Sequence, residues 1–99
     1  MRENRGSIRV DCASTAAGWA CDVVVGDDPG ATRHEVTVRR EDRDRLAPNV
    51  GPERLVEASF AFLLEREPRT SILRAFDLTE IGRYFPGYDD AIGDRVAGS

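Results

Sequence analysis

The stretch WACDVVVGDDPGATRHEVTV, residues 19–38, decides the fold. Successive side chains of a strand point to opposite faces, so apolar residues at every second position predict a half-buried strand. Trp19, Cys21, Val23 and Val25 share one face in this way. We therefore expect a strand that ends where the glycines and aspartates begin.

A turn and another strand follow. Residues 26–30 read Gly-Asp-Asp-Pro-Gly, in which proline fixes φ and glycine supplies positive φ, so the segment predicts a hairpin loop. His34, Val36 and Val38 then share one face of the next strand. The connection is too short for a crossover, so the two strands should pair antiparallel.

An earlier strand precedes this pair. Ile8, Val10 and Cys12 alternate with Arg9 and Asp11, which predicts a short first strand with one apolar face. The opposite face of all three strands is mostly polar, and we expect it to meet solvent. The sheet edges remain available for pairing between chains.

The second half of the chain predicts helices. Pro52 suits the first helical position, and an apolar stripe on one side follows it. Pro68 disfavours helical geometry at Glu67, so the helix should end close to there. The members of the stripe are Leu55, Val56, Ser59, Phe60, Leu63 and Leu64.

The remaining segments are shorter. Residues 39–45, RREDRDR, predict either a solvated strand end or one short helical turn, and residues 47–51 predict a linker. Residues 70–76 should form a short turn, after which Asp77 and Glu80 resemble a capping box that starts a helix over 78–85. We expect residues 1–6 and 88–99 to be loosely ordered.

The fold class predicted is α+β, as one domain over residues 1–99. Three antiparallel strands form a sheet, and a long amphipathic helix with one or two short C-terminal helices packs on one face. The order is β-β-β-α-α.

The composition of the chain limits the classes of function that it can have. The 99 residues carry a formal net charge of -4, which gives no overall attraction to nucleic acid or anionic lipid. The chain lacks an apolar run long enough to span a bilayer, and its start, MRENRGSIRV, lacks the apolar stretch of a signal peptide. We expect a cytoplasmic protein without a cofactor. Arginine supplies all 14 Lys+Arg positions, which favours a GC-rich prokaryotic source.

One longer pattern carries a resemblance. The segment FLLEREPRTSILRAFDLTEIGRYFP, residues 62–86, follows the strand HEVTV at residues 34–38. This arrangement, over residues 19–86, resembles small uncharacterised prokaryotic proteins. The resemblance supports one domain and transfers neither a function nor a site residue.

Cys12, Cys21 and His34 are the candidate metal ligands, because alternation places them on one face of adjacent strands. Thiolate and imidazole are zinc ligands, but the spacing matches no common zinc pattern. The alternative is a buried histidine beside reduced structural cysteines. A Cys12–Cys21 disulfide would require facing positions and an oxidising compartment.

Catalytic residues are not predicted. The sequence has neither a nucleophile elbow nor a GxxxxGK[ST] or GxGxxG phosphate-binding pattern. The acidic pairs at 27–28 and 89–90 suit turns and tail solvation better than acid-base chemistry.

Two surface clusters are candidates for binding. Tyr84, Phe85 and Tyr88 surround a Pro-Gly pair and have the composition of a protein-interaction hot spot. The alternative is that Phe85 closes the core and the tyrosines lie half-buried. The possible nucleic-acid patch contains Arg39, Arg40, Arg43 and Arg45, with interleaved acidic residues that oppose phosphate binding.

The leading hypothesis is a non-catalytic protein-interaction or adaptor domain. Its partner would be itself, as a homodimer, or another protein. The first alternative is a nucleic-acid-associated regulator that uses residues 39–45. The second is a small metal-dependent or thiol-dependent enzyme.

Overall fold

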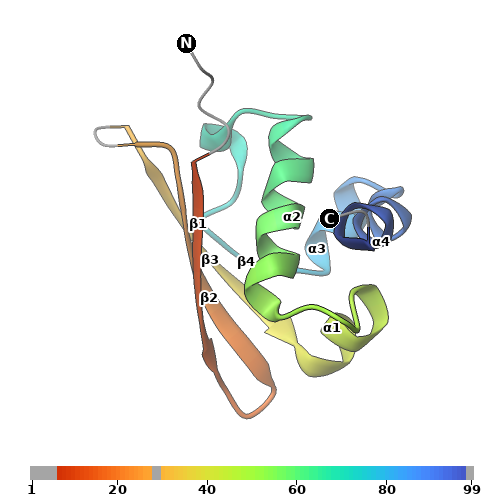
Figure 1. Ribbon diagram of the computed structural model, residues 1–99. Coiled ribbons are helices and arrows are strands. Elements are labelled where there is room, and N and C mark those ends of the chain that lie inside the picture. The colour runs from red at the N-terminus through yellow and green to blue at the C-terminus, as the bar shows by residue number, and fades with distance from the viewer. Residues whose placement is uncertain (1–6, 28–29, 98–99) are drawn as a thin grey trace.

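The computed structural model describes residues 7–27 and 30–97. All the helices lie on one side of a twisted sheet (Figure 1). The elements, in chain order, are β1 (Ile8–Ser14), β2 (Gly18–Val25), β3 (Thr32–Arg39), α1 (Arg40–Leu46), α2 (Pro52–Leu64), the 3-10 turn η2 (Arg69–Ser71), β4 (Ala75–Asp77), α3 (Glu80–Tyr84) and α4 (Tyr88–Ala97).

The three predicted strands are confirmed, and each pairs antiparallel with the next. Gly26 and Gly30 both adopt positive φ in the β2–β3 loop, at 94° and 99°, as the turn requires. The apolar face forms the core, where Cys21, Val23 and Val36 are each only 1% exposed. The opposite face carries the exposed charged residues Arg9, Asp11, Asp22 and Glu35.

A fourth strand corrects the predicted three-stranded antiparallel sheet. β4 pairs with β3 in parallel, and the strand order is β1-β2-β3-β4. The connection from β3 to β4 runs through α1 and α2, so it is long enough for the crossover that parallel pairing needs. Residues 75–77 are too few to show alternation, and the chain around them was therefore predicted as a turn.

The C-terminal segment also differs from the prediction. Residues 88–97 form α4 rather than a loosely ordered tail, and Tyr88 and Ile92 are fully buried. These two residues and the half-buried Val96 lie at spacing i, i+4, i+8, which places them on one helix face. α3 covers only Glu80–Tyr84, so it is shorter than the helix predicted over residues 78–85. Residues 1–6 and 98–99, for which loose order was also predicted, lie outside the described residues.

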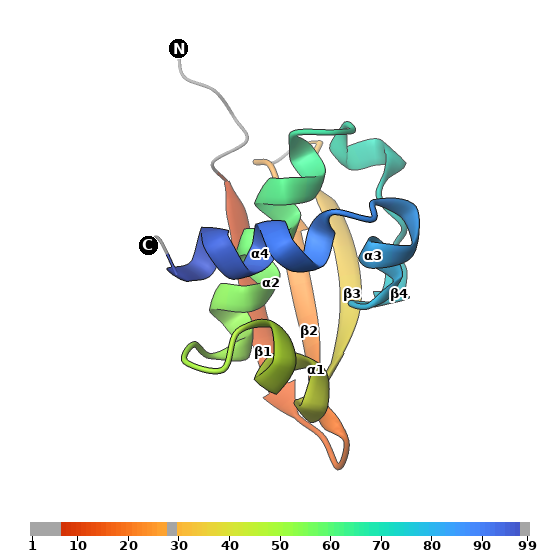
Figure 2. The same ribbon diagram turned by 90° about the vertical axis from the view of Figure 1, so that its right-hand side faces the viewer.

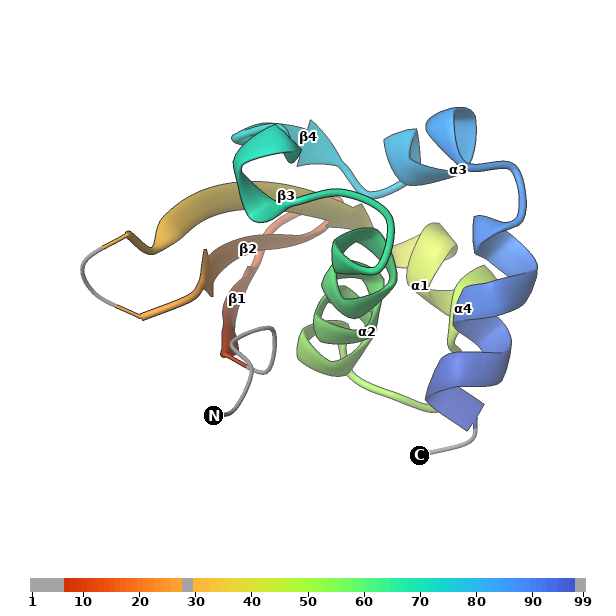
Figure 3. The same ribbon diagram turned by 90° about the horizontal axis from the view of Figure 1, so that it is seen from above.

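α2 lies between the sheet and α4 (Figures 2 and 3). It begins at Pro52, as predicted, and ends at Leu64, a few residues before Glu67. On the side of α4, the ring of Phe62 packs edge-on against Tyr88 at 5.4 Å between centroids. The buried Ser59 hydroxyl lies 2.6 Å from the Tyr88 hydroxyl and donates to the Leu55 carbonyl. Two layers therefore bury α2, which explains why Phe62 is buried although it lies outside the predicted stripe.

Candidate protein-interaction site

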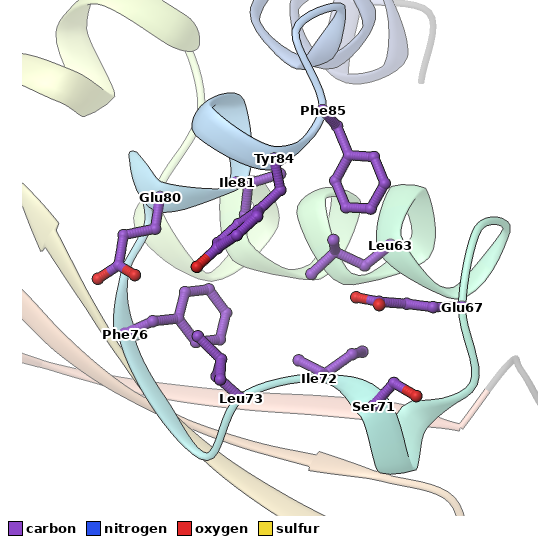
Figure 4. Close-up of a pocket in the computed structure, with 10 residues that line it drawn as sticks. All are labelled: Leu63, Glu67, Ser71, Ile72, Leu73, Phe76, Glu80, Ile81, Tyr84 and Phe85. Atoms are coloured by element: carbon purple, nitrogen blue, oxygen red, sulfur yellow. The ribbon is translucent and has the colours of Figure 1, made fainter.

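A pocket of about 290 Å³ opens beside β4. Its walls come from the end of α2, the chain from Glu67 to Phe76, and α3 (Figure 4). This volume is near the lower end for ligand pockets, so it suits one or two side chains of a partner. The lining residues are Leu63, Glu67, Ser71, Ile72, Leu73, Phe76, Glu80, Ile81, Tyr84 and Phe85.

The pocket is apolar inside and carries two large exposed side chains. Ile72, Phe76 and Ile81 are buried. Leu73 is 49% exposed and Tyr84 is 67% exposed, and they are the large hydrophobic side chains left exposed within the described part of the chain. Both line this one pocket (Figure 4). Exposed apolar surface gathered at a concave site is typical of a binding site.

Hydrogen bonds fix one wall of the pocket to the sheet. His34 is 3% exposed, and its Nδ1 lies 2.8 Å from the Leu73 carbonyl oxygen. A carbonyl oxygen only accepts, so Nδ1 carries a proton and donates it to Leu73. The other ring nitrogen, Nε2, lies 3.0 Å from the Thr32 hydroxyl, and the ring packs 5.3 Å from Phe60. The position of Leu73 is therefore determined by a buried side chain of β3.

Hydrogen bonds among Asp77, Thr79 and Glu80 hold the other wall. The Asp77 carboxylate accepts hydrogen bonds from the Thr79 backbone N–H at 3.0 Å and from its hydroxyl. In return, Oε2 of Glu80 accepts from the Asp77 backbone N–H at 3.3 Å. The bond from the Asp77 N–H to Glu80 is the one expected of the predicted capping box, but the Asp77 carboxylate accepts from Thr79 rather than from the Glu80 N–H, and α3 begins at Glu80 with Thr79 as its N-cap. α3 in turn carries Tyr84.

Two carboxylates lie at opposite ends of the pocket. Glu67 stands beside Ser71 and Ile72, and Glu80 stands beside Phe76 (Figure 4). Both side chains are half-buried. Their negative charges next to an apolar surface favour a ligand that combines an apolar group with a cation.

The predicted aromatic cluster divides between this pocket and the core. Tyr84 and Phe85 line the pocket, and the Phe85 ring also packs edge-on against Phe62 at 6.0 Å. Tyr88 is fully buried, so it belongs to the core and offers no surface to a partner. Its burial raises the pKa of the phenol, despite the hydrogen bond with Ser59.

The candidate metal ligands do not assemble. Cys12 and Cys21 face each other in register, with 4.0 Å between their Cα atoms, and form a disulfide, which corrects the expectation of reduced thiols. His34 lies opposite Val23 rather than Cys21, and hydrogen bonds occupy both of its ring nitrogens. The described residues contain no group of three or more His, Cys, Asp or Glu placed to hold a metal ion.

The arginines of residues 39–45 are engaged within the chain. Residues 40–46 form a two-turn helix, α1, which settles the alternatives left open for this segment. Arg40 and Arg43 stack over the Trp19 ring at 5.3 and 5.5 Å. Arg45 pairs with Asp42 at 3.5 Å and with Asp89 at 2.7 Å, and Arg39 lies 4.0 Å from Asp77.

The pocket residues that the sequence did not reveal are Leu63, Glu67, Ser71, Ile72, Leu73, Phe76, Glu80 and Ile81. One signal was present, because Ile72 and Leu73 are adjacent apolar residues in extended chain. Such neighbours point in opposite directions, so the core can take only one of them.

Comparisons with family models, with curated proteins and with solved structures found no match for this chain. Within residues 7–27 and 30–97, none of the helices has both the length and the apolar character needed to cross a membrane.

Proposed function

We propose that the protein is a non-catalytic interaction domain that binds a segment of a partner protein in the pocket beside β4. The observation that carries this proposal is the placement of Leu73 and Tyr84, because both exposed side chains line one apolar pocket. A protein partner that covered them would remove apolar area from water at roughly 25 cal/mol per Å². Tyrosine is also among the residues enriched at interaction hot spots.

The charges at the pocket define the partner segment further. Glu67 and Glu80 place a carboxylate at each end of an apolar surface. The segment that fits them has one aliphatic or aromatic side chain to enter the pocket and an arginine or lysine next to it. Complementary charge of this kind speeds association and fixes the orientation of the segment.

The anchored walls support binding because they limit the ordering that a partner must impose. The His34 hydrogen bond holds Leu73, and the hydrogen bonds of Asp77 with Thr79 and Glu80 hold the chain that leads into α3. A site whose walls are already ordered loses less conformational entropy on association.

The two alternative functions have weaker support. A nucleic-acid regulator would need arginines free to contact phosphate, whereas those of residues 39–45 contact carboxylates and the Trp19 ring. A thiol-dependent enzyme would need a thiolate, whereas the described cysteines are joined to each other.

Selection from a displayed library of random 12-residue peptides tests the proposal. We expect the enriched peptides to contain an apolar residue beside an arginine or lysine. Tyr84→Ala should weaken their binding about 30-fold, the effect of a hot spot of about 2 kcal/mol, in fluorescence polarisation. Glu67→Gln should weaken it less and reduce its salt dependence.

Arg83→Ala is the matched control, because Arg83 is an exposed α3 residue outside the pocket lining. It should bind the peptides like the wild type. The proposal fails if selection enriches no peptide, or if the enriched peptides bind Tyr84→Ala as tightly as the wild type.

A further inference from the structure

β1 is an open edge of the sheet. The strand order β1-β2-β3-β4 leaves its outer side without a neighbouring strand among the described residues. β1 spans seven residues, contains no proline, and pairs with β2 in an unbroken register. Monomeric proteins protect such edges with prolines, bulges or charged side chains, and of these β1 carries only the pair of opposite charges Arg9 and Asp11.

The β1–β2 register shows which backbone groups face outward. Ser7 and Gly26 form a hydrogen-bonded pair, since the Gly26 N–H donates to the Ser7 carbonyl at 2.8 Å. Such pairs alternate along an antiparallel ladder, so Arg9 and Asp11 also bond to β2. The N–H and C=O groups of Ile8, Val10 and Cys12 therefore point away from β2, toward the open edge.

The core is incomplete at the same edge. Ile8, Val10 and Cys12 point to the helix side of the sheet, yet all three are only half-buried. Their neighbours on β2, Val23 and Cys21, are 1% exposed. α2 packs more against β1 than against any other strand, yet it leaves these three side chains half-buried, so apolar residues of a neighbouring strand would cover them further.

We propose that β1 pairs antiparallel with β1 of a second copy of this chain, about a two-fold axis that passes beside Val10. Val10 then exchanges two backbone hydrogen bonds with Val10 of the second copy, and Ile8 pairs with Cys12. All the outward-facing backbone groups of these three residues find partners. The inference is independent of the proposed function, because the peptide pocket lies at β4, the opposite edge.

Several registers would pair the outward-facing N–H and C=O groups of the two β1 strands, and the charges of Arg9 and Asp11 favour this one. With Val10 at the centre, Arg9 of each copy lies directly opposite Asp11 of the other, at close non-hydrogen-bonded positions. A shift by one step in one direction places Arg9 opposite Arg9, and a shift the other way places Asp11 opposite Asp11. Opposite charges across such positions attract and like charges repel. Both side chains are exposed, so they are free to pair.

The resulting dimer has a defined shape. The two four-stranded sheets become one continuous sheet of eight strands. The two-fold axis runs perpendicular to this sheet, so both copies of α2 lie on one face. The two β4 edges, each with its pocket, lie at the far ends. The occupant of the β1 edge is thus a second copy, with two-fold isologous contacts.

Charge reversal tests the proposal in the full chain, by sedimentation equilibrium across a range of protein concentrations. Arg9→Asp and Asp11→Arg each place like charges opposite each other twice per dimer. Each should raise the dimer dissociation constant about tenfold or more. The double variant R9D/D11R restores both attractive pairs and should dimerise like the wild type. The proposal would be overturned if the wild type were still monomeric at roughly 1 mM. A dissociation constant of that size corresponds to a binding free energy of about -4 kcal/mol.

A backbone variant gives a second test. The Val10 N–H faces outward, so Val10→Pro removes a donor from the dimer ladder and none from the β1–β2 ladder. We expect a folded monomer with its disulfide intact. Arg9→Pro is the matched control, because it removes a donor to β2 and should destabilise the fold. Dimerisation of Val10→Pro with wild-type affinity, or equal affinity in all the charge variants, would also refute this mode of pairing.

Discussion

Reduction of the Cys12–Cys21 disulfide should destabilise the protein by an amount that the chain topology fixes. The two cysteines are separated by 9 positions along the chain. The loop-entropy relation, with about ten residues in the closed loop, gives roughly 2.7 kcal/mol at 25 °C. For a domain of this size, that free energy corresponds to a melting temperature lower by roughly 10–20 °C.

Circular dichroism during heating, with and without a phosphine reductant, measures this difference on one sequence. The side chains are the same in both states, so no cavity contributes to the result. Alkylation followed by mass spectrometry verifies the redox state of each sample. The variant C12S/C21S is the control, because reductant should leave its melting temperature unchanged. The reasoning is refuted if the oxidised and reduced wild types melt together, or if the air-oxidised protein carries two free thiols.

Two further predictions concern a carboxylate and a glycine. Burial favours a higher pKa for Asp77, but its hydrogen bonds, chiefly those from Thr79, hold that pKa below its ordinary value of 3.8. The ionised Asp77 therefore stabilises the fold above that value, and this stabilisation is lost as pH falls through the lower folded-state pKa. In urea unfolding, the free energy of unfolding of Asp77→Asn should decrease less on acidification than that of the wild type. A Cβ on Gly18 would lie 2.1 Å from the Val38 carbonyl oxygen, so Gly18→Ala should lower the free energy of unfolding by about 2–3 kcal/mol, whereas Gly87→Ala, which has open space, should change it little.

The strands were predictable because their signals are local. Val36 and Val38 alternate with polar residues, and Gly26 and Gly30 allow the turn that precedes them. Each signal depends only on neighbours a few positions away, so the sequence is sufficient to locate it. The start of α2 at Pro52 was predictable for the same reason.

The missed elements depend on contacts that are distant in sequence. β4 joins the sheet because Phe76 lies beside Val36, a pairing across the whole helical connection. α4 is held by Tyr88 and Ile92, but the same ten residues include Asp89, Asp90, Asp94 and Arg95, so the segment has little apolar character of its own. The disulfide was left open for a different reason, since the facing positions of Cys12 and Cys21 follow from the hairpin but its oxidation depends on the compartment.

The candidate site was only partly predictable. Tyr84 and Phe85 were identified from the density of aromatic residues, whereas Tyr88 was expected either in the same interaction cluster or half-buried, and it is fully buried. The difference between Tyr84 and Tyr88 is set by α4, which carries Tyr88 onto Phe62. The cytoplasmic location remains a prediction, and the disulfide is a feature more typical of oxidising compartments.

The position of α2 between two layers has a consequence for synthesis on the ribosome. The sheet side of α2 can be covered as soon as the helix has emerged, because β1, β2 and β3 precede it. The side that carries Ser59 and Phe62 waits for α4, about two dozen residues later. At synthesis rates of about 5–20 residues per second, this interval lasts roughly 1–5 s. During that time the nascent chain presents an uncovered aromatic flank, which is the kind of surface that chaperones at the ribosome recognise.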